Sequence, residues 1–182
     1  MKKYFLSGIL AGVISVFAVG SAVAFLVMRS GLVPVNANQA PPPWESRLLK
    51  SALHASVARY ASKETNPRPP TEENLKAGAE IYTQLCAECH GLPHKGPSIY
   101  GSSFYPPAPQ LAGAASFYTE AELFWIVKHG IRNTAMPAWG STLTDQDLWQ
   151  VVALVKKFDA LPPAVEAEWK GERQGAAGRD ER

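Results

Sequence analysis

The sequence has few cysteines, few methionines and almost no excess of either charge. Its 182 residues include two cysteines, which is too few for a disulfide-dense secreted scaffold. The formal net charge of +2 gives no reason to expect nucleic acid as a partner, since that requires a concentrated basic face. Fifteen prolines and fourteen glycines are too few for collagen or for general disorder. By length, the chain holds one domain with extensions or two very small domains.

Residues 1–29 contain one long apolar run, from Tyr4 to Met28, which has no charged side chain. As a helix it would be roughly 37 Å long at about 1.5 Å per residue, enough to cross a hydrocarbon core. The segment Ala22–Ala24 resembles a signal-peptide cleavage site, so an uncleaved anchor and a removed signal sequence both stay open. Lys2 and Lys3 predict a cytoplasmic N-terminus, which places residues 30–182 on the outer side of the membrane.

Residues 30–70 combine a proline-rich linker with an amphipathic helix expected over 45–63. Leu49, Leu53, Val57 and Tyr60 fall on one helical stripe, widened by Leu48 and Ala52. Three roles are open for this basic helix: contact with an anionic membrane surface, docking on a partner subunit, or packing on the chain's own domain. We expect residues 71–161 to form that domain, and 162–182 to be a charged, largely disordered tail.

The motif Cys86-Ala87-Glu88-Cys89-His90 is the attachment signature of a c-type haem. Two cysteines on one helical turn present their sulfurs to the two vinyl groups of a porphyrin, and His90 is then held beneath the ring to ligate iron. Alternatives fit less well. A disulfide would close a very small loop, a thioredoxin-like pair would need a βαβ context, and a zinc site would need a fourth ligand.

Electron transfer requires a second axial ligand on the haem iron. Met136 is the only methionine outside the N-terminal segment, and Pro137 keeps it out of helical geometry. A thioether opposite histidine raises the reduction potential. Filling a gap in the core is the alternative role for Met136, and His129, His94 and His54 are the alternative ligands.

With these residues in view, Thr71–Leu161 resembles a class I cytochrome c domain and is similar to the monohaem domains of cbb3-type oxidase subunit III. The resemblance implies an all-α cytochrome c fold of three to four helices around one covalently bound haem c. In this chain that fold would follow a transmembrane helix and an amphipathic helix. Helices are expected at Glu72–Leu85, at about Glu120–His129, and from Thr144. Thr71, Thr119 and Thr144 would cap them.

In the family, a glycine and an aromatic four residues apart let the terminal helices pack closely, which corresponds here to Gly78 and Tyr82. The family also has a proline carbonyl that accepts the second N–H of the haem-ligating histidine. The resemblance suggests Pro97 for this carbonyl, and Tyr105 and Trp139 as residues against the porphyrin. Trp149 is expected near the first helix of the domain.

Taken together, these expectations describe a membrane-tethered electron carrier, not an enzyme. It would pass single electrons between a membrane-bound redox donor and acceptor on the periplasmic side of the inner membrane, with no small-molecule substrate. One alternative is a fixed haem subunit of a larger membrane oxidoreductase, such as an oxidase, a quinol-oxidising complex or a dehydrogenase. A second is a haem sensor or peroxidase with an open iron site.

Overall fold

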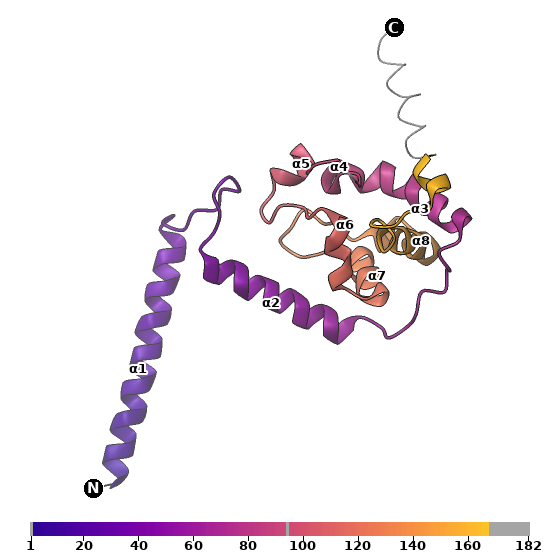
Figure 1. Ribbon diagram of the computed structural model, residues 1–182. Coiled ribbons are helices and arrows are strands. Elements are labelled where there is room, and N and C mark those ends of the chain that lie inside the picture. Colours follow the sequence, from indigo (N-terminus) through magenta and orange to yellow (C-terminus); the bar gives the residue numbers. More distant parts are fainter. Residues whose placement is uncertain (1, 94, 168–182) are drawn as a thin grey trace. The chain divides into compact units, whose positions relative to one another are not determined.

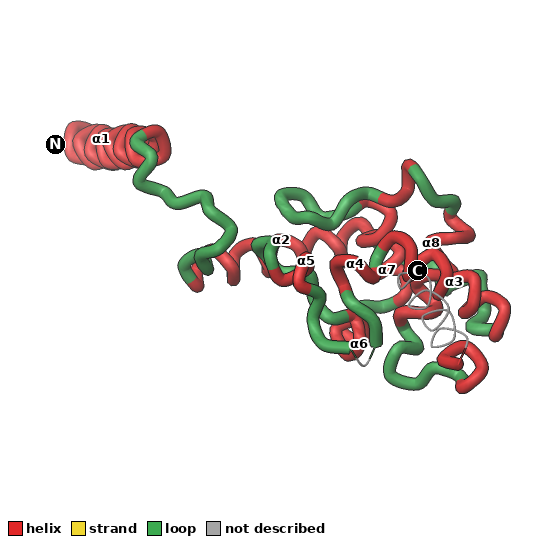
Figure 2. Tube along the Cα trace, turned by 90° about the horizontal axis from the view of Figure 1, so that it is seen from above, coloured by secondary structure: helices red, strands yellow, loops and turns green. Residues whose placement is uncertain are grey.

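The computed structural model describes residues 2–93 and 95–167, and every regular element in these ranges is helical (Figures 1 and 2). The chain divides into two units, Met1–Asn36 and the residues from Ala37 onward. The first unit holds α1 (Lys2–Arg29). The second contains α2 (Pro43–Tyr60), α3 (Glu72–Leu85), α4 (Ala87–His90), α5 (Ile99–Ser102), α6 (Leu111–Ala114), η1 (Ala115–Phe117), α7 (Glu120–His129), η2 (Trp139–Ser141) and α8 (Asp145–Val155).

Helix α1 makes up most of the first unit. By length and composition, Tyr4–Arg29 could cross a membrane, and none of its side chains is buried within the protein. Water solvates exposed apolar side chains poorly, so such a helix suits a membrane-spanning anchor or a signal sequence. The helix therefore fits the anchor expected from the sequence.

The core of the second unit is the crossing of α3 and α8 (Figure 1). Gly78 lies at the crossing, where a Cβ atom would overlap the backbone carbonyl oxygen of Gln150 and lie 3.2 Å from the Cβ of Leu154. One turn further, the Tyr82 ring meets the Phe158 ring edge-on, with the centroids 5.0 Å apart. The predicted use of Gly78 and Tyr82 as the close-packing pair is confirmed.

Helix α8 is buried on all sides and not along a single stripe. Its eight buried residues run from Leu148 to Val155, so α8 is the central helix of the unit. Trp149 stacks on Phe124 of α7, with the ring centroids 4.1 Å apart and the planes inclined by 14°. The sequence had placed Trp149 near α3, whereas its ring partner comes from α7.

Three threonines cap the N-termini of α3, α7 and α8, as predicted. The side chain of Thr71 accepts a hydrogen bond from the Asn74 amide at the start of α3. Thr119 and Thr144 form reciprocal capping boxes with Glu122 and Asp147 at the starts of α7 and α8. These bonds satisfy amide groups that a helix leaves without partners at its N-terminus.

Helix α2 packs on the chain's own domain. Val57 is 0% exposed, the His54 ring stacks on Tyr118 at 5.4 Å, and Tyr60 lies parallel to Trp125 of α7 at 6.4 Å. The observed helix begins and ends two to three residues before the predicted limits of 45–63. Leu48 and Leu49 are 61% and 53% exposed, so the predicted apolar stripe is buried only in the C-terminal half of the helix.

The chain beyond α8 still contributes to the core. Residues 163–167 are helical, and Val165 is 1% exposed among the core side chains. The folded part therefore extends past the predicted boundary at residue 161, because Val165 supplies an apolar side chain that α8 and its neighbours bury. The remainder of the predicted tail, 168–182, lies outside the described residues.

Candidate haem-binding site

The cysteine motif lies at the junction of α3 and α4. The Cys86 amide donates to the carbonyl of Tyr82 at 2.9 Å and ends α3, and the His90 amide donates to the Cys86 carbonyl at 2.9 Å. This single turn holds Cys86, Cys89 and His90 together, as the motif predicts. Both thiols are free and half-buried, so the pair does not form a disulfide.

The donor set of this turn does not suit a bare metal ion. Within residues 2–93 and 95–167, no group of three or more His, Cys, Asp or Glu side chains is arranged to hold a metal. Burial, and secondarily the neighbouring Cys89, raises the pKa of the Cys86 thiol to about 12. A structural zinc site takes four protein ligands, and this turn supplies three. Two cysteines and one histidine fit instead a group that brings its own ring of nitrogen ligands to the iron.

The imidazole of His90 is held through one nitrogen. Its Nδ1 lies 2.9 Å from the carbonyl oxygen of Pro109, nineteen residues further along the chain. Because a carbonyl only accepts, Nδ1 carries the proton and Nε2 is left with the lone pair that a metal requires. The sequence had suggested Pro97 for this acceptor. Pro97 is exposed, and the structure gives the bond to Pro109 instead.

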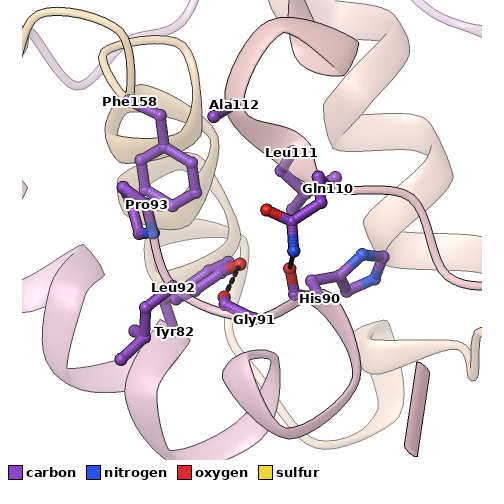
Figure 3. A pocket seen from close by; sticks show the side chains of 9 residues that line it. All are labelled: Tyr82, His90, Gly91, Leu92, Pro93, Gln110, Leu111, Ala112 and Phe158. Carbon is purple, nitrogen blue, oxygen red and sulfur yellow. Dashed lines mark hydrogen bonds between the residues drawn. The ribbon is translucent and has the colours of Figure 1, made fainter. Parts of the chain in front are cut away.

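Two side chains form hydrogen bonds to the backbone of His90 and Gly91. The side-chain amide of Gln110 donates to the His90 carbonyl at 3.3 Å, and the Tyr82 hydroxyl donates to the neighbouring Gly91 carbonyl at 2.7 Å. A small hollow lies between these residues and is also lined by Leu92, Pro93 and Phe158 (Figure 3). The His90 ring points away from Tyr82 and Phe158, so this hollow is behind the histidine and not on its ligating side (Figure 3).

Met136 lies in the connection between α7 and η2. The Met136 amide donates to the Thr134 hydroxyl at 3.1 Å, and the Met136 carbonyl accepts from the Ile131 amide at 3.1 Å. Gly130 is at φ +67, and a Cβ there would lie 2.8 Å from the Met136 carbonyl oxygen. The connection is therefore a compact turn with a half-buried methionine, which is suited to holding a side chain in one place.

The other predicted pocket residues have contacts of their own. The Tyr105 hydroxyl is 2.9 Å from the Ser46 hydroxyl, which ties the loop before α6 to α2. Trp139 is half-buried at the start of η2, where that turn packs on α7.

Two of the alternative histidine ligands contact aromatic rings. His54 lies against Tyr118, and the His129 ring is 5.1 Å from that of Trp125. His94 lies outside the described residues.

The comparison with protein families agrees with this geometry. Residues 73–155 match the family model described as cytochrome C oxidase, cbb3-type, subunit III. The match begins at the first turn of α3 and ends at the last residue of α8. It therefore includes the cysteine motif, the Pro109 acceptor and Met136.

Curated relatives carry the same domain within longer chains. A cbb3-type cytochrome c oxidase subunit FixP of Sinorhizobium medicae is 29% identical over 119 residues, which is 63% of this chain and 37% of the relative. FixP of Azorhizobium caulinodans is 32% identical over 53% of this chain and 31% of the relative. A thiosulfate dehydrogenase of Stutzerimonas stutzeri is 30% identical over 51% of this chain and 30% of the relative.

These matches cover about a third of the length of the relatives, so they compare a domain and not the whole proteins. That domain includes the cysteine motif and the crossing of α3 and α8 in an all-helical unit. The family match, the fold and the motif agree that residues 73–155 form a class I c-type cytochrome domain.

Proposed function

We propose that this protein is a membrane-tethered monohaem c-type cytochrome that transfers single electrons through a haem ligated by His90 and Met136. The observation that carries the proposal is the state of the cysteine-motif turn. Cys86 and Cys89 are unpaired on one turn, and the bond from His90 Nδ1 to Pro109 leaves Nε2 as the metal-binding atom. The chain has one such motif, so the proposal includes a single haem.

In this proposal each residue has a distinct task. Cys86 and Cys89 would hold the porphyrin through thioethers, and His90 and Met136 would supply a nitrogen and a sulfur ligand to its iron. A haem bound there would supply one-electron redox chemistry. Two protein ligands leave no position open for a substrate, which favours an electron carrier over an open-site sensor or peroxidase. Tyr105 and Trp139 remain proposed pocket residues.

The apolar α1 supports a tether to the membrane. We propose a single-pass anchor with a cytoplasmic N-terminus and the haem domain on the periplasmic side, where c-type haem is attached. A tether raises the effective concentration of the domain near membrane partners. The partners proposed are a membrane-bound electron donor and acceptor, since the relatives are named as an oxidase subunit and a dehydrogenase.

The second candidate is a fixed haem subunit of such an oxidoreductase, and the names of the FixP relatives favour it. Docking on a partner subunit was one of the three roles that the sequence left open for the amphipathic helix, and the observed helix does not argue for it. Helix α2 buries Val57 and stacks His54 and Tyr60 on its own domain. Purification in mild detergent separates the two candidates, because a subunit should come with other chains at fixed stoichiometry.

Optical spectroscopy of the full chain in detergent tests the ligation. The oxidised protein should be low-spin and show the far-red sulfur-to-iron band, and the ferrous protein should not bind carbon monoxide rapidly. Met136→Ala should abolish the band, whereas the control Met28→Ala in α1 should retain it. A pyridine haemochrome assay should give one haem per chain. A high-spin wild type that binds carbon monoxide at once would overturn the His/Met proposal.

A further inference from the structure

One segment of the loop between the cysteine motif and α6 contacts three consecutive residues of that motif. The Ser98 hydroxyl donates to the Glu88 carbonyl, and it also accepts from the Gly101 amide at 3.2 Å, so it caps α5. Further along, Pro109 accepts from the His90 ring. We call residues 98–110 the clamp segment. It reaches the motif at Glu88, at Cys89 and at His90.

The contact at Cys89 is made by Gly101 and depends on its small size. A Cβ atom at Gly101 would overlap the carbonyl oxygen of Cys89, and would lie 2.9 Å from the carbonyl carbon. The φ angle of Gly101 is outside the left-handed region, so any residue could adopt this backbone conformation. Glycine is therefore needed here for space. The opposing atoms belong to backbone that ends in the haem-ligating turn and cannot move as a side chain can.

Gly101 is also linked directly to the acceptor of the histidine bond. The Gly101 carbonyl accepts from the Ala108 amide at 2.9 Å, which places Ala108 next to Gly101 and fixes the position of the following residue, Pro109. The Cβ atom of Ala108 would lie 3.1 Å from an added Cβ at Gly101. A displacement of Gly101 away from Cys89 would thus be passed through one backbone hydrogen bond to the carbonyl that holds His90.

We propose that Gly101 is a positioning residue for the haem-ligating imidazole: its close approach to Cys89 sets the Pro109 carbonyl against His90 Nδ1 and thereby tunes the reduction potential. The inference rests on the proposed function, since it requires His90 on iron. A hydrogen bond from Nδ1 to a carbonyl makes the imidazole more basic and favours ferric iron. Weakening that bond should therefore raise the potential.

The test compares Gly101→Ala with Gly96→Ala in the full chain, loaded with haem and solubilised in detergent. Gly96 is in the same loop and has no heavy atom within 4 Å of an added Cβ, so it controls for the substitution itself. In Gly101→Ala the equilibrium constant for reduction should rise roughly fivefold, as expected when a hydrogen bond is largely lost. The ring protons of His90 should shift in the paramagnetic NMR spectrum. Neither should change in Gly96→Ala.

A second variant covers the case in which Gly101→Ala does not mature. Ser98→Ala removes the bond to Glu88 while leaving space at Cys89, and it should raise the potential in the same direction by a smaller factor. Potentials and NMR shifts equal to the wild type in the matured variants would overturn the inference. Failure of the proposed function is visible separately, because the wild-type spectrum itself would then lack the far-red band.

Discussion

Replacing Gly78 with alanine should destabilise the haem domain, although alanine is the better helix former. Gly78 is in the middle of α3, and its added Cβ would overlap the Gln150 carbonyl oxygen and lie 2.8 Å from the carbonyl carbon. These are backbone atoms of α8, whose buried residues surround it on every side. The two helices must therefore separate, and the Tyr82–Phe158 contact next to the crossing must shift with them.

Two opposing contributions set the magnitude. Alanine in place of glycine gains roughly 0.5–1 kcal/mol of helix propensity. Overpacking a tight core typically costs about 1–3 kcal/mol. This site is at the upper end of that range, because the atoms opposite Gly78 are backbone atoms that cannot move aside as a side chain can. The net loss of unfolding free energy should be about 1–2 kcal/mol. For a domain of this size that lowers the melting temperature by roughly 5–15 °C.

Thermal unfolding of the haem-loaded chain in detergent, followed by circular dichroism, measures this effect. Gly96→Ala is the matched control, since nothing lies within 4 Å of its added Cβ, and its melting temperature should be close to that of the wild type. If Gly78→Ala were as stable as the wild type, the close helix crossing would be wrong.

Three further substitutions test individual interactions in the haem domain. Lys156→Met removes the ammonium that donates to the Ala115 and Tyr118 carbonyls at 3.3 and 3.0 Å, and should cost about 1–3 kcal/mol in denaturant unfolding, whereas Lys157→Met should cost little. Thr144→Ala removes a capping box and should cost about 1 kcal/mol, and an unchanged midpoint would contradict the observed cap. Burial, with Glu122 as a smaller cause, raises the pKa of Tyr118 above its usual 10.0. The unfolded chain then releases this proton first, so stability should fall as pH rises past about 10, and Tyr118→Phe should make that fall shallower.

Helix positions in the haem domain were predictable because local signals agree there. A threonine cap, an acidic first turn and a periodic apolar stripe specify α3 and α7, which match the predicted limits. The apolar periodicity of α8 underestimates how many of its residues are buried. The apolar stripe of α8 is Leu148, Val151, Val152 and Val155, but Gln150, Ala153 and Leu154 are buried too. A helix packed between others has no exposed face that periodicity could identify.

Contacts between distant segments were less predictable. Nothing local indicates that Val165, which follows two prolines, belongs to the core. Nor does anything local indicate that α2 buries Val57 against its own domain. The sequence left three partners open for that helix because an apolar stripe specifies only that something covers it. The choice depends on which aromatic rings, here Tyr118 and Trp125, lie on the facing surface.

The histidine acceptor shows this limit at the functional site. The resemblance predicts that some proline carbonyl bonds to His90, but the loop after the motif contains several prolines and no periodicity that orders them. The resemblance suggested Pro97, seven residues from His90. The structure uses Pro109, because α5 first turns the chain back over Cys89 through the close approach of Gly101. The choice of acceptor thus depends on the small size of Gly101, which has no functional side chain. A sequence pattern for it would have to include the glycine that permits the turn as well as the proline that makes the bond.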